Sequence, residues 1–103
     1  MSIPRPEIEA TITLLPASSS PRTKPLNWLG VGYFGCPMVL PSGMWDVRMV
    51  FPKETAPVPL GSTVEAHLQF LSPQKVLPQL TVGTEFQLWD GKIFGNGRVT
   101  KIL

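Results

Sequence analysis

The chain has 103 residues, of which 43% are hydrophobic, and a net charge of +2. This length fits one domain with a modest core, and so small a charge does not by itself indicate nucleic-acid binding. Twelve prolines and nine glycines, spread without a period, exclude collagen and disfavour long helices, so they predict short strands joined by turns.

The first part of the chain predicts a loose lead-in at residues 1–6 and a strand at residues 7–15. Apolar and polar residues alternate in this strand, as in a half-buried strand of a sheet. The residues expected to point inward are Ile8, Ala10, Ile12 and Leu14. Residues 16–25, PASSSPRTKP, have the composition of a loop.

Two strands are expected in the middle of the chain. Residues 29–36 predict a second strand, weakened by three glycines, and residues 37–43 predict a connection. Residues 44–51 alternate again and predict a third strand with Trp45, Val47, Met49 and Phe51 on one face. Residues 52–61 contain three prolines and predict a loop.

The last part of the chain predicts three more strands. Residues 63–71 form the clearest one, and a connection follows over residues 72–83. Strands at residues 85–89 and from residue 92 to the end flank Asp90-Gly91. A two-residue Asp-Gly loop is a strong hairpin signal because both positions need a positive φ. Gly95 and Gly97, inside the final strand, predict a β-bulge or a tight bend.

Together these patterns predict an all-β fold: a single domain over residues 1–103 built as a small closed barrel of six mostly antiparallel strands. Short strands must close or pack on themselves to protect their edges. Every proline is expected outside the strands or at their edges.

Residue types that carry chemistry are sparse. The sole histidine, His67, is predicted to be an exposed strand residue, and the sole cysteine, Cys36, a buried inert thiol. One histidine and one cysteine cannot supply the three or four ligands of a zinc site. The sequence therefore predicts no catalytic residue, no metal, no cofactor and no enzyme activity.

Targeting signals are also lacking. A lone cysteine cannot form an internal disulfide, residues 1–10 contain no stretch typical of a signal peptide, and no apolar run approaches the roughly 18 residues needed to span a bilayer. We therefore expect a cytoplasmic protein that does not bind membranes.

A known family shares several features of this sequence. The ending FQLWDGKIFGNGRVTKIL contains a phenylalanine (Phe86), an acidic-Gly turn followed by Lys92, a Gly-x-Gly pair and a terminal V-T-K-I. With VEAHLQFLSPQ before it, this part resembles the C-terminal half of the third domain of elongation factor Tu, a six-stranded β-barrel. Residues 7–15, Arg22-Thr23-Lys24-Pro25 and Leu60-Gly61-Ser62 are similar to earlier parts of that domain.

The resemblance implies a non-catalytic domain that contacts other macromolecules. In that family nucleotide binding belongs to another domain, and this chain has neither a G-x-x-x-x-G-K-[ST] phosphate loop nor an Asn-Lys-x-Asp motif. We therefore expect no GTP binding. Arg22 and Asp90 match family positions that contact tRNA.

The leading hypothesis is a module that binds a protein partner, and an exposed tryptophan is typical of binding hot spots. The candidate contact residues are Trp89, Asp90, Gly91, Lys92, Arg22 and Lys24. One alternative is RNA binding, with Arg22, Lys24, Lys92 and Arg98 on phosphates. Another is an immunity-type protein that neutralises its partner.

Overall fold

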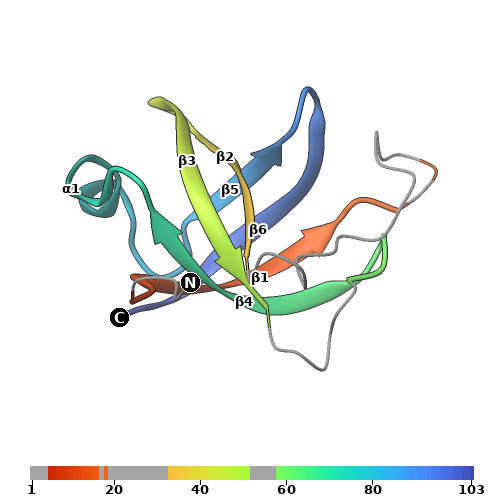
Figure 1. Cartoon of the computed structure of the whole chain (residues 1–103), viewed down its shortest axis with the longest axis horizontal. Helices are drawn as coiled ribbons and strands as arrows, with labels where there is room; N and C mark the ends of the chain where they lie inside the picture. The colour runs from red at the N-terminus through yellow and green to blue at the C-terminus, as the bar shows by residue number, and fades with distance from the viewer. Residues whose placement is uncertain (1–4, 17, 19–32, 52–57) are drawn as a thin grey trace.

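Six antiparallel strands form one closed barrel (Figure 1). The computed structural model describes residues 5–16, 18, 33–51 and 58–103. The strands are β1 (Ile8–Leu14), β2 (Phe34–Leu40), β3 (Gly43–Val50), β4 (Thr63–Phe70), β5 (Glu85–Trp89) and β6 (Ile93–Ile102). Their order around the barrel is β1-β4-β3-β2-β5-β6, and pairing between β1 and β6 closes it. The predicted fold class is confirmed.

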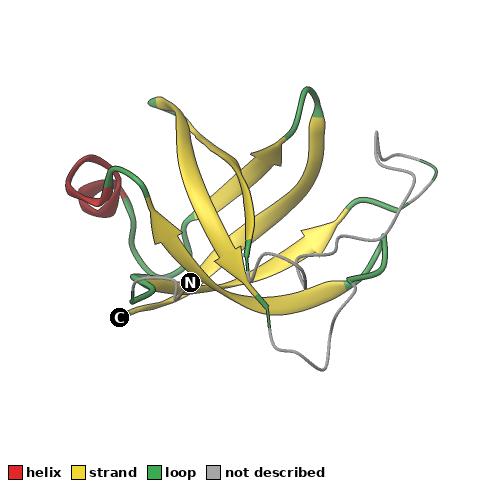
Figure 2. Ribbon diagram, in the orientation of Figure 1, coloured by secondary structure: helices red, strands yellow, loops and turns green. Residues whose placement is uncertain are grey.

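One short helical segment lies outside the barrel wall (Figure 2). It consists of α1 (Pro73–Val76) and the 3-10 turn η2 (Leu77–Gln79). Proline is tolerated in the first turn of a helix, which is where both elements carry one. Within the described part of the chain, no helix has the length and apolar character needed to cross a membrane.

The barrel interior is lined by the faces that the alternation predicted. On β1 every second residue from Ile8 to Leu14 is fully buried, and on β4 Ala66, Leu68 and Phe70 are buried. The rings of Phe34 and Phe94 meet edge to face, with centroids 6.0 Å apart. Burying each large side chain contributes about 1.5–3 kcal/mol, so this lining is the main source of stability.

The second strand lies later in the chain than its pattern predicted. It runs from Phe34 to Leu40, so the prediction of a connection at residues 37–43 is wrong. Residues 29–32 of the predicted strand lie outside the described residues. Pro37 sits inside β2, contrary to the expectation that prolines stay at strand edges. Alternate burial continues on either side of it, at Cys36 and Met38, because a proline can keep an extended backbone although it lacks an N–H.

The turn between β5 and β6 also differs in detail from the prediction. The strands pair up to Trp89 and Ile93, which leaves Asp90, Gly91 and Lys92 in the turn rather than Asp-Gly alone. Among the described residues no non-glycine has a positive φ, so Asp90 does not adopt one, whereas Gly91 does, at 78°. The Asp90 backbone N–H donates to the Lys92 carbonyl over 2.9 Å.

Strand β6 contains two irregularities rather than a bulge at the Gly-Asn-Gly stretch itself. Against β5 the pairing passes from Leu88 with Gly95 to Trp89 with Ile93, so Phe94 is an extra residue. Against β1 the extra residue is Thr100. The first bulge turns Phe94 into the barrel, where it is fully buried.

Candidate functional site

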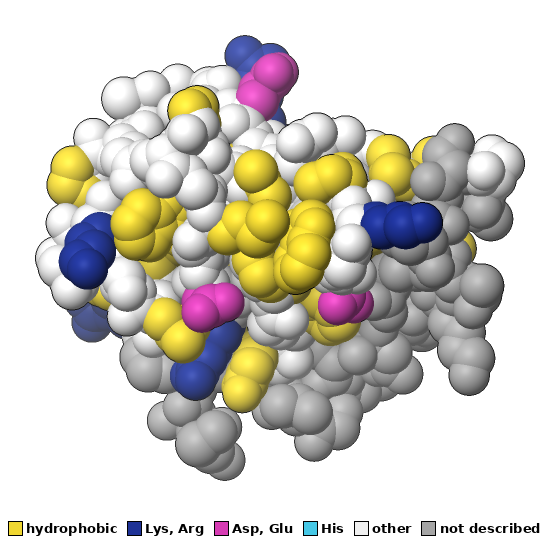
Figure 3. Space-filling view, turned by 90° about the horizontal axis from the view of Figure 1, so that it is seen from above, with side chains coloured by type: hydrophobic (Ala, Val, Ile, Leu, Met, Phe, Trp, Pro, Cys, Tyr) yellow, Lys and Arg dark blue, Asp and Glu magenta, His cyan; other side chains and the backbone are white. Residues whose placement is uncertain are grey.

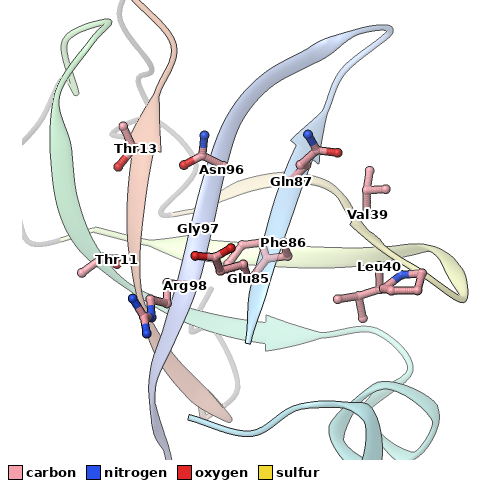
Figure 4. A pocket seen from close by; sticks show the side chains of 11 residues that line it. Thr11, Thr13, Val39, Leu40, Glu85, Phe86, Gln87, Asn96, Gly97 and Arg98 are labelled. Carbon is pink, nitrogen blue, oxygen red and sulfur yellow. The ribbon is translucent and has the colours of Figure 1, made fainter. Parts of the chain in front are cut away.

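A hollow of about 730 Å³ lies on the outer face of the barrel. It crosses β1, β6, β5 and β2 and reaches the turn after β2 (Figure 4). We call it the outer groove. Its lining consists of Thr11, Thr13, Val39, Leu40, Pro41, Glu85, Phe86, Gln87, Asn96, Gly97 and Arg98.

The strand register sets the polar residues of the outer groove in two rows. In the first row, Asn96 lies opposite Thr13 of β1 on one side and opposite Gln87 of β5 on the other. Figure 4 shows these three side chains in succession across the strands. Neighbouring strands lie about 4.8 Å apart, so the sheet holds the row at a fixed spacing.

The second row carries the charges of the outer groove. Arg98 lies opposite Thr11 on β1 and opposite Glu85 on β5. Directly opposite residues of unlike charge can pair across strands. Here no ion pair joins them, and Figure 4 shows the Arg98 guanidinium pointing away from the Glu85 carboxylate.

Most polar side chains of the outer groove have no partner among the described residues. No hydrogen bond or ion pair within the described ranges engages the side chains of Thr11, Glu85, Gln87, Asn96 or Arg98. Thr13 alone is engaged, through its hydroxyl, which lies 2.9 Å from the Thr63 hydroxyl. The outer groove therefore presents hydrogen-bonding groups and two opposite charges that no other described side chain engages.

The floor and one end of the outer groove are apolar. Phe86 is 3% exposed and packs over Gly97, whose missing side chain leaves room for the ring. Leu40 is 6% exposed and lies beside Val39 and Pro41 at the β2 end. Side chains held in this way form a surface that does not need to rearrange when a ligand arrives.

The sequence-predicted contact residues lie at the turn next to this groove. Trp89 is half-buried at the end of β5, and Asp90, Gly91 and Lys92 are exposed in the turn. Trp89 follows Glu85 and Gln87 at alternate positions of β5. Arg22 and Lys24 lie outside the described residues.

The residues examined for chemistry occupy ordinary structural positions. His67 is 53% exposed, and its Nε2 lies 3.5 Å from Oε1 of Glu9 on β1. Cys36 is buried, as predicted. No cluster of three or more potential metal ligands occurs within the described ranges.

A second hollow, of about 520 Å³, lies where the start of the described chain meets the end of β4 and the C-terminus. Gln69 contributes a buried Oε1 atom that has no hydrogen-bond partner among the described residues. Glu7 closes this end of the barrel, because its Oε1 accepts a 2.8 Å hydrogen bond from the Phe70 backbone N–H.

No known protein family and no curated protein matches this sequence. The residues of the outer groove are therefore identified by their geometry alone.

Among the residues that line the outer groove, sequence reasoning named only Arg98 as a candidate contact residue. Part of the outer groove could have been found from the sequence. The alternation of the last two strands predicts that Glu85, Gln87, Asn96 and Arg98 point outward. The alternation of β1 also predicts that Thr11 and Thr13 point outward, but no local signal places β1 beside β6, from which it is far away in the sequence.

Proposed function

We propose that this chain is a non-catalytic binding module whose partner is a protein. The observation that carries the proposal is the outer face of β5 and β6. It combines side chains of the outer groove that no described residue engages, those of Glu85, Gln87, Asn96 and Arg98, with the exposed turn beside Trp89. Threonine, asparagine and glutamine side chains form hydrogen bonds without exchanging protons near neutral pH, which suits recognition.

The resemblance to the third domain of elongation factor Tu supports the same proposal. That domain is a barrel without catalytic residues that contacts other macromolecules, and the chain described here is a closed six-stranded barrel. The turn of Asp90, Gly91 and Lys92 belongs to the matching part of the sequence.

Capture experiments with matched variants test the proposal. The tagged protein is expected to retain a protein partner that Trp89→Ala loses, since a tryptophan at an interface centre contributes 2 kcal/mol or more in typical cases. Met44→Ala is the control, because Met44 is 52% exposed near the start of β3, a strand that does not line the outer groove. Equal retention by both variants would place the contact surface elsewhere.

The salt dependence of binding separates a protein partner from RNA. Binding of single-stranded RNA weakens steeply with salt, with a slope near −0.7 for each contacted phosphate. Capture that is sensitive to nuclease and follows such a slope would contradict the proposal and favour RNA.

A further inference from the structure

We propose that the outer groove binds an extended peptide segment of the partner, one that carries both an acidic and a basic side chain. This inference rests on the proposed function and adds to it the chemical class of what is recognised. The acidic side chain is assigned to Arg98 and the basic one to Glu85.

The two amides of the first row fit a peptide backbone. Each of Gln87 and Asn96 carries donors on its NH₂ group and an acceptor on its carbonyl, and each peptide group likewise carries one donor and one acceptor. The two amides lie directly opposite each other on β5 and β6. A peptide that lies across β5 and β6 can therefore form hydrogen bonds to both amides through its own backbone N–H and C=O groups.

The two charges of the second row require a ligand of mixed charge. Glu85 and Arg98 are both exposed, and neither forms an ion pair with another described residue. A polyanion such as a nucleic acid would be attracted by Arg98 and repelled by Glu85, so it would release few counterions on binding. A peptide with one residue of each sign gives both groups a charge-assisted hydrogen bond.

The buried floor argues against ligands that are held by stacking. Single-stranded nucleic acids rely on exposed aromatic faces, and the aromatic ring that lines the outer groove, Phe86, is 3% exposed. The apolar end formed by Val39, Leu40 and Pro41 suits an aliphatic side chain of the same peptide.

The shape of the site favours an extended segment over a flat protein surface. Its volume of about 730 Å³ lies within the range of 300–1,000 Å³ that is usual for pockets that bury small ligands. A few residues of extended chain can enter such a hollow. Figure 3 shows one face of the molecule, where apolar side chains gather near the middle with acidic and basic side chains around them.

Nuclear magnetic resonance titration of the ¹⁵N-labelled protein tests the inference directly. The probe is an end-capped pentapeptide of sequence Lys-Ala-Val-Ser-Asp, and the matched probe Gln-Ala-Val-Ser-Asn lacks both charges. We expect saturable shifts of the Thr11, Gln87, Asn96 and Arg98 signals with the charged peptide, at a dissociation constant near 1 mM for so short a probe. The neutral peptide loses both charge-assisted hydrogen bonds and is therefore expected to bind about a hundredfold more weakly.

Variants of matched charge make the test specific. Arg98→Gln and Glu85→Gln are expected to weaken binding of the charged peptide about tenfold each, as does loss of a charge-assisted hydrogen bond. Lys75→Gln on α1 and Asp46→Asn on β3 remove a charge of the same sign outside the groove and should leave binding unaltered. The amide spectrum of each variant reports whether its fold is intact.

Three results would overturn the inference. They are the absence of saturable shifts in the groove with the charged peptide, equal binding by Arg98→Gln and Lys75→Gln, and groove binding of a uridine decamer in place of the peptide. If the peptide fails while Trp89→Ala still loses a captured protein, the inference falls and the proposed function stands. If the peptide fails and no capture depends on Trp89, both fall.

Discussion

At the scale of single residues, two glycines in this barrel serve different purposes. An added Cβ at Gly97 would overlap the Phe86 ring and lie 2.9 Å from Cδ1 of Ile12. At Gly35, in contrast, the nearest atom to an added Cβ is 3.8 Å away. Gly97 is therefore required by packing, whereas Gly35 is not.

We expect Gly97→Ala to lower the free energy of unfolding by about 1–3 kcal/mol, because inserting a methyl group into a filled interior forces side chains out of their preferred rotamers. Gly35→Ala, the control, should be neutral or stabilise by up to about 1 kcal/mol, since alanine reduces the entropy of the unfolded chain. Urea denaturation of both variants measures the difference. Equal effects would mean that Phe86 does not restrict residue 97.

At the scale of elements, a chain of hydrogen bonds joins the β2–β3 turn to the helical segment. The Trp45 indole N–H donates to the Ser42 hydroxyl over 2.9 Å, and that hydroxyl donates to Oε1 of Gln79 over 2.6 Å. The Gln79 amide in turn donates to the Lys75 carbonyl over 2.9 Å. These bonds hold η2 against the end of the barrel.

Ser42→Ala and Gln79→Ala are each expected to cost about 1 kcal/mol of stability, because each removes hydrogen bonds of this chain. The double variant should cost less than the sum by about 0.5 kcal/mol or more, since both changes break the bond between the two residues. A double-mutant cycle in urea measures this coupling. Gln74→Ala on α1 is the control, and strictly additive effects would contradict the network.

The contact between β2 and β5 is the shortest seam of the barrel. Only two residue pairs, Met38 with Leu88 and Val39 with Gln87, join these strands, whereas seven join β1 and β6. Pro37, which lacks an N–H, lies directly before the paired residues of β2 and cannot extend the ladder by donating a bond.

The barrel is therefore expected to open first between β2 and β5. Amides of this seam should exchange with solvent deuterium faster than those between β1 and β4 or β1 and β6, because local opening follows the number of bonds that must break. Hydrogen exchange followed by nuclear magnetic resonance gives the order. Earlier opening around β1 would show that pair count does not control local stability here.

At the scale of the whole molecule, the barrel closes by pairing the first strand with the last. The radius of gyration of the Cα atoms is 12.7 Å, close to the value of about 13 Å expected for a compact domain of this length. The Leu103 backbone N–H donates to the Glu7 carbonyl over 3.0 Å, so the two ends of the described chain meet. Closure of the barrel therefore joins β1 and β6, which are more than seventy residues apart in the sequence.

Such a topology is expected to fold slowly, in milliseconds to seconds. The chain must lose the entropy of closing long loops before pairing between distant strands contributes favourable free energy. Stopped-flow refolding followed by tryptophan fluorescence measures the rate. A refolding time in microseconds would be incompatible with a transition state that requires pairing of β1 with β6.

The local pattern of the sequence determined much of the barrel. Alternation of apolar and polar residues has a period of two only in strands, so it identified β1, β3 and β4 and the buried faces of each. The turn at Gly91 could also be predicted locally, because an Asp-Gly pair favours a reversal of the chain. The pattern failed at β2, where glycines and Pro37 masked an alternation that continues through them.

Apart from the hairpin of β5 and β6, which strands became neighbours was decided by tertiary structure. Asn96 lies opposite Gln87, to which the hairpin signal relates it, and opposite Thr13, more than eighty positions earlier, to which no local signal relates it. Strand pairing is set by the global requirement to bury every inner face and leave no edge unpaired. The outer groove is a product of that closure, so its composition could be determined only from the folded barrel.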